Sequence, residues 1–89
     1  MTEKTTLING VNLANASISQ LAKIIADDWK NPYYGATPYI GAMRELSNIT
    51  DRYGVEDGRS IVLYFTCNAN AWRGDVAKAV KAELKKRLK

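Results

Sequence analysis

The side chains with the clearest binding chemistry are three tyrosines in the stretch WKNPYYGATPYIGAM, residues 29–43. A tyrosine ring packs like a hydrocarbon while its hydroxyl keeps a polar partner, so tyrosine is enriched at protein-binding hot spots. The same ring also stacks on nucleobases. Tyr33, Tyr34 and Tyr39 are therefore the candidate partner-binding residues, provided that they face outward together.

The same stretch also has a purely structural interpretation. Trp29 ends one apolar helix stripe and Tyr39 opens the next. Pro32 and Pro38 bracket a reversal of the chain, and Gly35 lets the backbone turn. On this interpretation the rings only pack a helix junction, and both interpretations stay open for different rings.

A second set of candidates lies in the lysine-rich end of the chain. Residues 72–89 carry seven Lys or Arg against two acids, a net +5, whereas the whole chain is +4. A cationic stripe on a helix neutralises nucleic-acid phosphates. The stripe and its neighbour comprise Arg73, Lys78, Lys81, Lys85 and Lys89. The alternative is a solvated face, which the modest overall charge and the lack of a helix-turn-helix signature favour.

Catalytic and metal-binding patterns are missing from the sequence. With no His and a single Cys, the common zinc sites and His-assisted nucleophiles cannot be built. The adjacent pair Asp27-Asp28 would point about 100° apart on a helix and would not converge on a metal. We therefore expect no enzyme, no metal and no cofactor. Cys67 stands in an apolar run and is expected to be a small buried hydrophobe.

The first helix is predicted to begin after Ser17, because Ser17 and Gln20 match a capping box. It should end at Asn31-Pro32, since a residue before proline resists the α conformation. Its apolar stripe comprises Ile18, Leu21, Ala22, Ile25 and Trp29.

A second helix is predicted from Thr37, as its cap, and Pro38, in its first turn. Apolar residues continue one face as far as Tyr53, and Gly54 is expected to stop the helix in the left-handed conformation. An interruption at Ser47-Asn48 is the alternative.

Residues 60–72 are rich in β-branched and aromatic side chains, which suit a strand as well as a helix. A lone strand is not stable, and the only other weak strand candidate is the N-terminal arm. We therefore predict a helix, apolar nearly all round and central in the fold. Trp29, Phe65 and Trp72 are assigned to the core.

The last helix is predicted to start at Asp75 as N-cap, with Glu83 and Arg87 paired one turn apart. The predicted fold is all-α: a small bundle of about four helices over residues 17–89. Residues 1–16 form a flexible arm in which a short strand is possible. No 18-residue apolar run and no signal-peptide pattern occur, so we expect a cytoplasmic protein without a membrane partner.

Three motifs are similar to small proteins encoded by phages and prophages of Gram-positive bacteria. They are a Trp-x-Asn…Ala-x-Pro-Tyr run, a Gly-Arg-Ser-Ile-Val run and a Trp-Arg-Gly run, at residues 29–39, 58–62 and 72–74. The resemblance covers about residues 21–88. It implies a phage origin and helical character, and it brings no catalytic or binding residues.

Three functions follow from these observations as hypotheses. The favoured one is a non-catalytic protein-interaction module, which binds through the tyrosines in the cytoplasm of a bacterial host. The second is nucleic-acid binding through the lysine-rich helix. The third is a structural, self-associating component of a phage particle.

Overall fold

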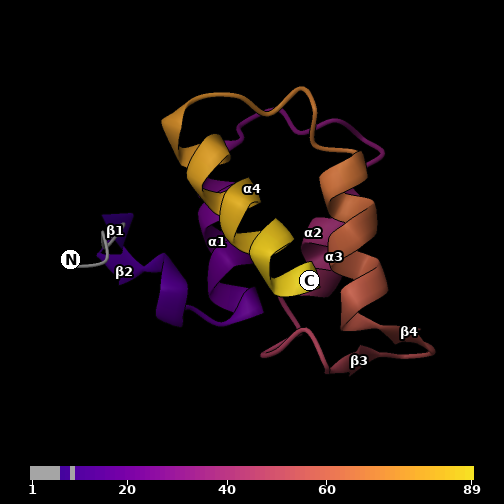
Figure 1. Cartoon of the computed structure of the whole chain (residues 1–89). Coiled ribbons are helices and arrows are strands. Elements are labelled where there is room, and N and C mark those ends of the chain that lie inside the picture. The colour runs from indigo at the N-terminus through magenta and orange to yellow at the C-terminus, as the bar shows by residue number, and fades with distance from the viewer. Residues whose placement is uncertain (1–6, 9) are drawn as a thin grey trace.

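Four α-helices form the body of the protein in the computed structural model, which describes residues 7, 8 and 10–89 (Figure 1). They are α1 (Ile18–Asp28), α2 (Thr37–Met43), α3 (Gly58–Cys67) and α4 (Asp75–Leu88). Helices α1 and α3 each pack against both α2 and α4, so the four helices close into a ring around one core. The predicted helical bundle is thus confirmed in its main feature.

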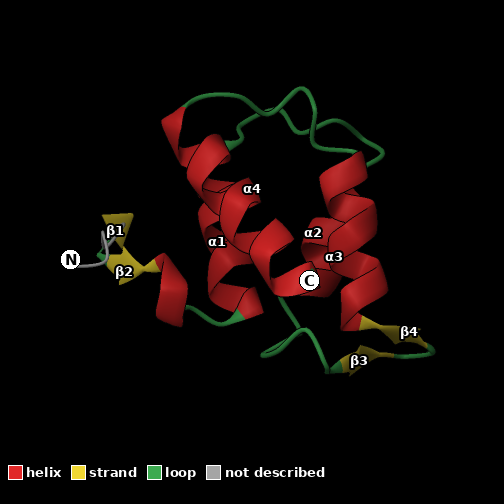
Figure 2. Cartoon of the chain, viewed as in Figure 1, coloured by secondary structure: helices red, strands yellow, loops and turns green. Residues whose placement is uncertain are grey.

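Two short antiparallel hairpins accompany the helices, so the fold is mostly helical rather than all-α (Figure 2). In the first, β1 (Leu7–Ile8) pairs with β2 (Val11–Asn12). In the second, β3 (Arg52–Tyr53) pairs with β4 (Glu56–Asp57). Strand β3 of the second hairpin occupies residues that the sequence placed at the end of a helix.

Part of the predicted N-terminal arm packs on the helices. A 3₁₀ helix, η1 (Leu13–Asn15), follows β2, and both Leu13 and Ala16 are buried in the core. The Arg87 guanidinium, from α4, donates to the Leu13 carbonyl at 2.8 Å. The remainder of the arm, residues 1–6 and 9, lies outside the described residues.

Helix α1 begins with the predicted capping box. The Ser17 hydroxyl accepts from the Gln20 N–H at 3.1 Å, and the Gln20 side chain accepts from the Ser17 N–H at 2.8 Å. The helix ends at Asp28, and Trp29 is its C-cap. The start of the helix therefore follows from its local cap, whereas its end comes before the Asn31-Pro32 stop that the sequence predicted.

Helix α2 ends at Met43, so the prediction that it continues to Tyr53 is wrong. The Asp51 carboxylate accepts from the Ser47 N–H at 2.8 Å and from the Asn48 N–H at 2.9 Å. An acidic side chain that binds these amides offers the backbone an alternative to the helix. Gly54 does have a positive φ of 63°, but it lies in the turn of the β3–β4 hairpin.

The caps of α2 and α4 are each displaced by one residue from the prediction. Ala36 is the N-cap of α2, and the Thr37 hydroxyl instead donates to the Tyr34 carbonyl at 3.0 Å. Gly74 is the N-cap of α4, and Asp75 stands in the first turn, where an acid favours the helix dipole. The predicted pair of Glu83 and Arg87 is present at 2.7 Å.

Helix α3 is a helix as predicted, but it ends at Cys67 rather than at Trp72, and it is not buried all round. Leu63 and Tyr64 are 46% and 45% exposed, and Cys67 is exposed as well. The predictions of a central helix and of a buried Cys67 are therefore wrong. In a ring of four short helices each helix keeps one outer face toward solvent, because a chain this small has no further element to cover that face.

The centre of the core is aromatic. The rings of Trp29 and Trp72 stack at 5.9 Å with an interplanar angle of 14°. Phe65 meets both of them edge-on, at 6.5 Å and 6.3 Å. The Trp72 indole N–H also donates to the Asp28 carboxylate at 2.8 Å. All three rings are buried, as the sequence predicted.

None of the helices in the described part of the chain has the length and apolar character needed to cross a membrane.

A glycine is required at the start of α3. A Cβ at Gly58 would lie 2.8 Å from the Ile49 carbonyl oxygen and 2.9 Å from that of Asp51. Both are backbone atoms, so Gly58→Ala should lower the free energy of unfolding by about 1–3 kcal/mol. At Gly41, where a Cβ would meet nothing within 4 Å, the same change should raise it by about 0.5–1 kcal/mol. Urea unfolding measures both, and equal stability of the two variants would contradict the packing.

The Asp57 N-cap of α3 predicts that the stability of the fold depends on pH in the acidic range. Its carboxylate accepts from the Ser60 N–H at 2.7 Å, and this hydrogen bond lowers the pKa of Asp57 below its ordinary 3.8. Because the folded pKa is the lower one, the ionised cap stabilises the fold above about pH 4 and is lost as pH falls through the folded value. Asp57→Asn keeps an acceptor that does not titrate.

Wild type should therefore lose melting temperature more steeply than Asp57→Asn as the pH is lowered from about 4 to 2. Circular dichroism melts across this range give the measurement. Parallel profiles for the two proteins would show that the cap contributes nothing through its charge.

Candidate functional site

Tyr33 and Tyr34 lie in the loop between α1 and α2 and both face solvent. Tyr33 is 45% exposed and Tyr34 is 81% exposed. Their rings pack against each other at 4.8 Å, and a side-chain hydrogen bond with Tyr34 raises the pKa of Tyr33 above its ordinary 10.0. The two rings therefore form one outward-facing pair.

Gly35 allows Tyr33 to lie against the backbone beside α3. A Cβ at Gly35 would stand 2.5 Å from the Tyr33 ring and 3.2 Å from the Asn68 side-chain oxygen. The Asn68 amide in turn donates to the Tyr64 carbonyl at 2.8 Å. This chain of contacts connects the tyrosine loop to the last turn of α3.

Tyr39 does not join Tyr33 and Tyr34 directly, as the sequence hypothesis required. It is half-buried on α2, and its ring packs at 5.7 Å against Tyr64 of α3. Sequence reasoning assigned Tyr64 to a buried face and so missed it. The sequence did contain a sign that Tyr64 faces outward. Tyr64 is next to the core residue Phe65, and neighbouring helical residues point in different directions.

We call Tyr33, Tyr34, Tyr39 and Tyr64 together the tyrosine surface. Its rings come from three segments, the α1–α2 loop, α2 and α3, and Asn68, next to Gly35 of the loop, donates to the Tyr64 carbonyl. None of the four residues is a Lys, Arg, Asp or Glu. The arrangement can bury aromatic area against a partner and satisfy the partner's polar groups with phenol hydroxyls.

Four of the five cations proposed for nucleic-acid binding converge on one surface hollow of about 480 Å³. We call it the cationic hollow. Its charged lining consists of Arg73, Lys78, Lys81 and Lys85, and no acidic side chain lines it. Lys89 is not part of it and lines a separate hollow with Lys86 and Arg87. The lysine stripe is thus divided between two places.

Lys81 is held by the protein itself. Its ammonium group lies 5.9 Å from the centre of the Trp72 ring and donates to the Trp72 carbonyl. Burial lowers the pKa of Lys81, and the neighbouring charges of Lys85 and Arg73 lower it further. Lys81 is therefore half-buried against Trp72, whereas Lys78 and Lys85 are exposed.

Comparison of the chain with protein-family models, with curated proteins and with solved structures gave no match.

Proposed function

We propose that the chain is a small accessory protein of phage type, a non-catalytic interaction module that binds a partner protein through the tyrosine surface. The observation that supports it best is the presence of two tyrosine pairs from three separate segments, with three of the four rings exposed. Tyr34 is 81% exposed and Tyr33 and Tyr64 are each 45% exposed. Adjoining exposed aromatic side chains mark interaction surfaces on small domains.

A protein partner suits this surface better than a nucleic acid does. Nucleic-acid affinity depends largely on the neutralisation of phosphates by Lys and Arg. The four side chains of the tyrosine surface include no cation, and phenol hydroxyls both donate and accept hydrogen bonds. Such groups match the mixed peptide amides and apolar side chains of a protein.

Nucleic-acid binding is the second candidate function, because the cationic hollow brings four basic side chains together without an acid in its lining. This surface is separate from the tyrosine surface, since no residue belongs to both. The two functions can therefore be tested by independent variants.

Loss of the exposed rings should weaken capture of the partner. Tyr33→Ala combined with Tyr34→Ala removes exposed area and leaves the core intact, so folding should be unchanged. The dissociation constant for the captured protein should rise about thirtyfold, which corresponds to about 2 kcal/mol for a hot spot. Pull-down from bacterial lysate, followed by titration with the purified partner, measures this.

Tyr53→Ala is the matched control, because Tyr53 is 47% exposed on β3 and lies outside the tyrosine surface. Equal capture by the double variant and by this control would overturn the proposal. The partner could also be a second copy of the chain. Sedimentation of the wild-type protein tests this, because self-association would appear as a mass above that of the monomer.

The second candidate predicts salt-dependent binding to random duplex or single-stranded DNA. Lys78→Ala with Lys85→Ala should lower the slope of log affinity against log salt by about 2. Lys89→Ala, outside the cationic hollow, is the control. Fluorescence anisotropy across a salt series provides the measurement, and absence of binding at low salt would exclude this function.

A further inference from the structure

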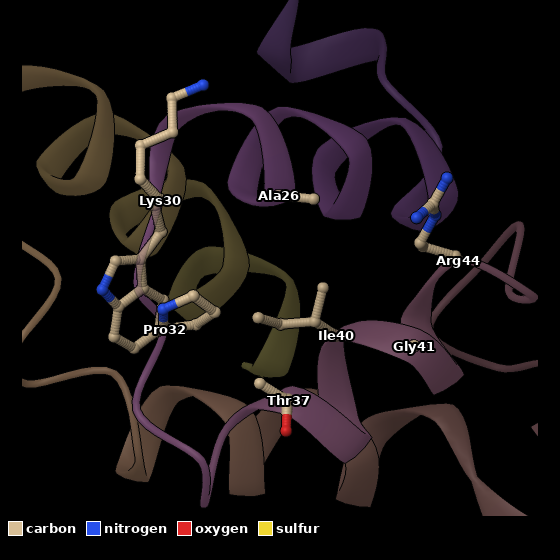
Figure 3. A pocket seen from close by; sticks show the side chains of 8 residues that line it. Ala26, Lys30, Pro32, Thr37, Ile40, Gly41 and Arg44 are labelled. Atoms are coloured by element: carbon tan, nitrogen blue, oxygen red, sulfur yellow. The ribbon is translucent and has the colours of Figure 1, made fainter.

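A groove of about 380 Å³ lies between α1 and α2, next to the tyrosine loop (Figure 3). Its base includes Trp29 and Ile40, which are core residues with 8% and 7% of their surface left exposed. The groove is an open trough on the protein surface rather than an enclosed cavity. An open trough covers one side of an extended chain better than it encloses a small molecule.

The groove is open because two small residues face each other across it. Ala26 of α1 and Gly41 of α2 both line it, and both are exposed (Figure 3). Gly41 stands inside a helix, its φ is not positive, and a Cβ there would meet nothing within 4 Å. Glycine weakens a helix relative to alanine, and neither a turn nor close packing requires it here. The bare backbone leaves room for a group from outside the chain.

Positive charges stand at the two ends of the groove. Figure 3 shows Lys30 at one end and Arg44 at the other, with Ala26 and Ile40 between them. No acidic side chain lines the groove, and neither cation forms an ion pair within residues 7, 8 and 10–89. An apolar centre flanked by two unpaired cations is complementary to an apolar segment flanked by carboxylates.

We infer that this groove binds a short acidic segment of the partner protein. An apolar side chain of that segment lies over Ile40 and Gly41, and its carboxylates meet Lys30 and Arg44. The inference rests on the proposed function and extends its binding surface. Pro32 and Thr37, which line the groove, flank Tyr33 and Tyr34 in the chain, so one partner covers both places.

The test is selection of short random peptides on the full-length protein, followed by titration of the enriched peptides. Enriched sequences should carry Asp or Glu on both sides of an apolar residue. Gly41→Leu fills the groove, so it should weaken binding at least about tenfold. Because leucine is the better helix former, the same variant should raise the melting temperature. Loss of binding with gain of stability separates blocking from unfolding.

Charge is tested by a pair of double variants with the same net charge. Lys30→Glu with Arg44→Glu should weaken binding of the enriched peptides about tenfold or more. Lys78→Glu with Lys85→Glu, in the cationic hollow, should leave it within about twofold apart from a general salt-dependent effect. Equal losses in the two variants would overturn the inference.

Three further results would also overturn it: no enrichment, enrichment of peptides without acids, or unchanged binding by Gly41→Leu. Capture of the partner protein tests the proposed function separately. If partner capture is lost in the Tyr33 and Tyr34 variant but kept in Gly41→Leu, the tyrosine surface stands and the groove does not. If neither variant affects capture, both fail.

Discussion

The stacking of Trp29 on Trp72, with Phe65 against both, is the contact on which the rest of the structure depends. It joins the end of α1, the last turn of α3 and the loop before α4. A buried indole N–H needs a partner, and the Asp28 carboxylate provides it at 2.8 Å. The stack therefore fixes two connecting loops at the same end of the helix ring (Figure 1).

Each surface of interest is built on one side of this stack. Trp29 forms part of the base of the groove between α1 and α2, and Trp72 lines the cationic hollow. The tyrosine loop begins a few residues after Trp29 and is held to the end of α3 through Gly35 and Asn68. A small domain with one core has little capacity to position several surfaces independently, so a shared rigid centre positions them together.

Three glycines show that packing decides whether a glycine is required at its position or only tolerated there. Gly58 has backbone oxygens on all sides of the missing Cβ, and Gly35 has the Tyr33 ring there, whereas Gly41 has open space. Sequence inspection treats the three residues alike. Only the neighbours that the fold supplies distinguish a glycine that the core needs from one that leaves a groove open.

The sequence by itself determined what depends on residues a few positions apart. These features are the Ser17–Gln20 cap at the start of α1, the positive φ of Gly54 and the burial of the three aromatic core residues. Tertiary structure decided the path of the chain after α2, where the Leu46 and Ser47 carbonyls accept from the Ser19 and Ile18 N–H groups, and the exposure of one face of α3. It also decided which tyrosines and lysines come together. The physical reason is that contacts between distant residues decide which side chains are exposed. Asp28 and Trp72, for example, lie 44 residues apart. The spacing of residues within one segment does not reveal such contacts.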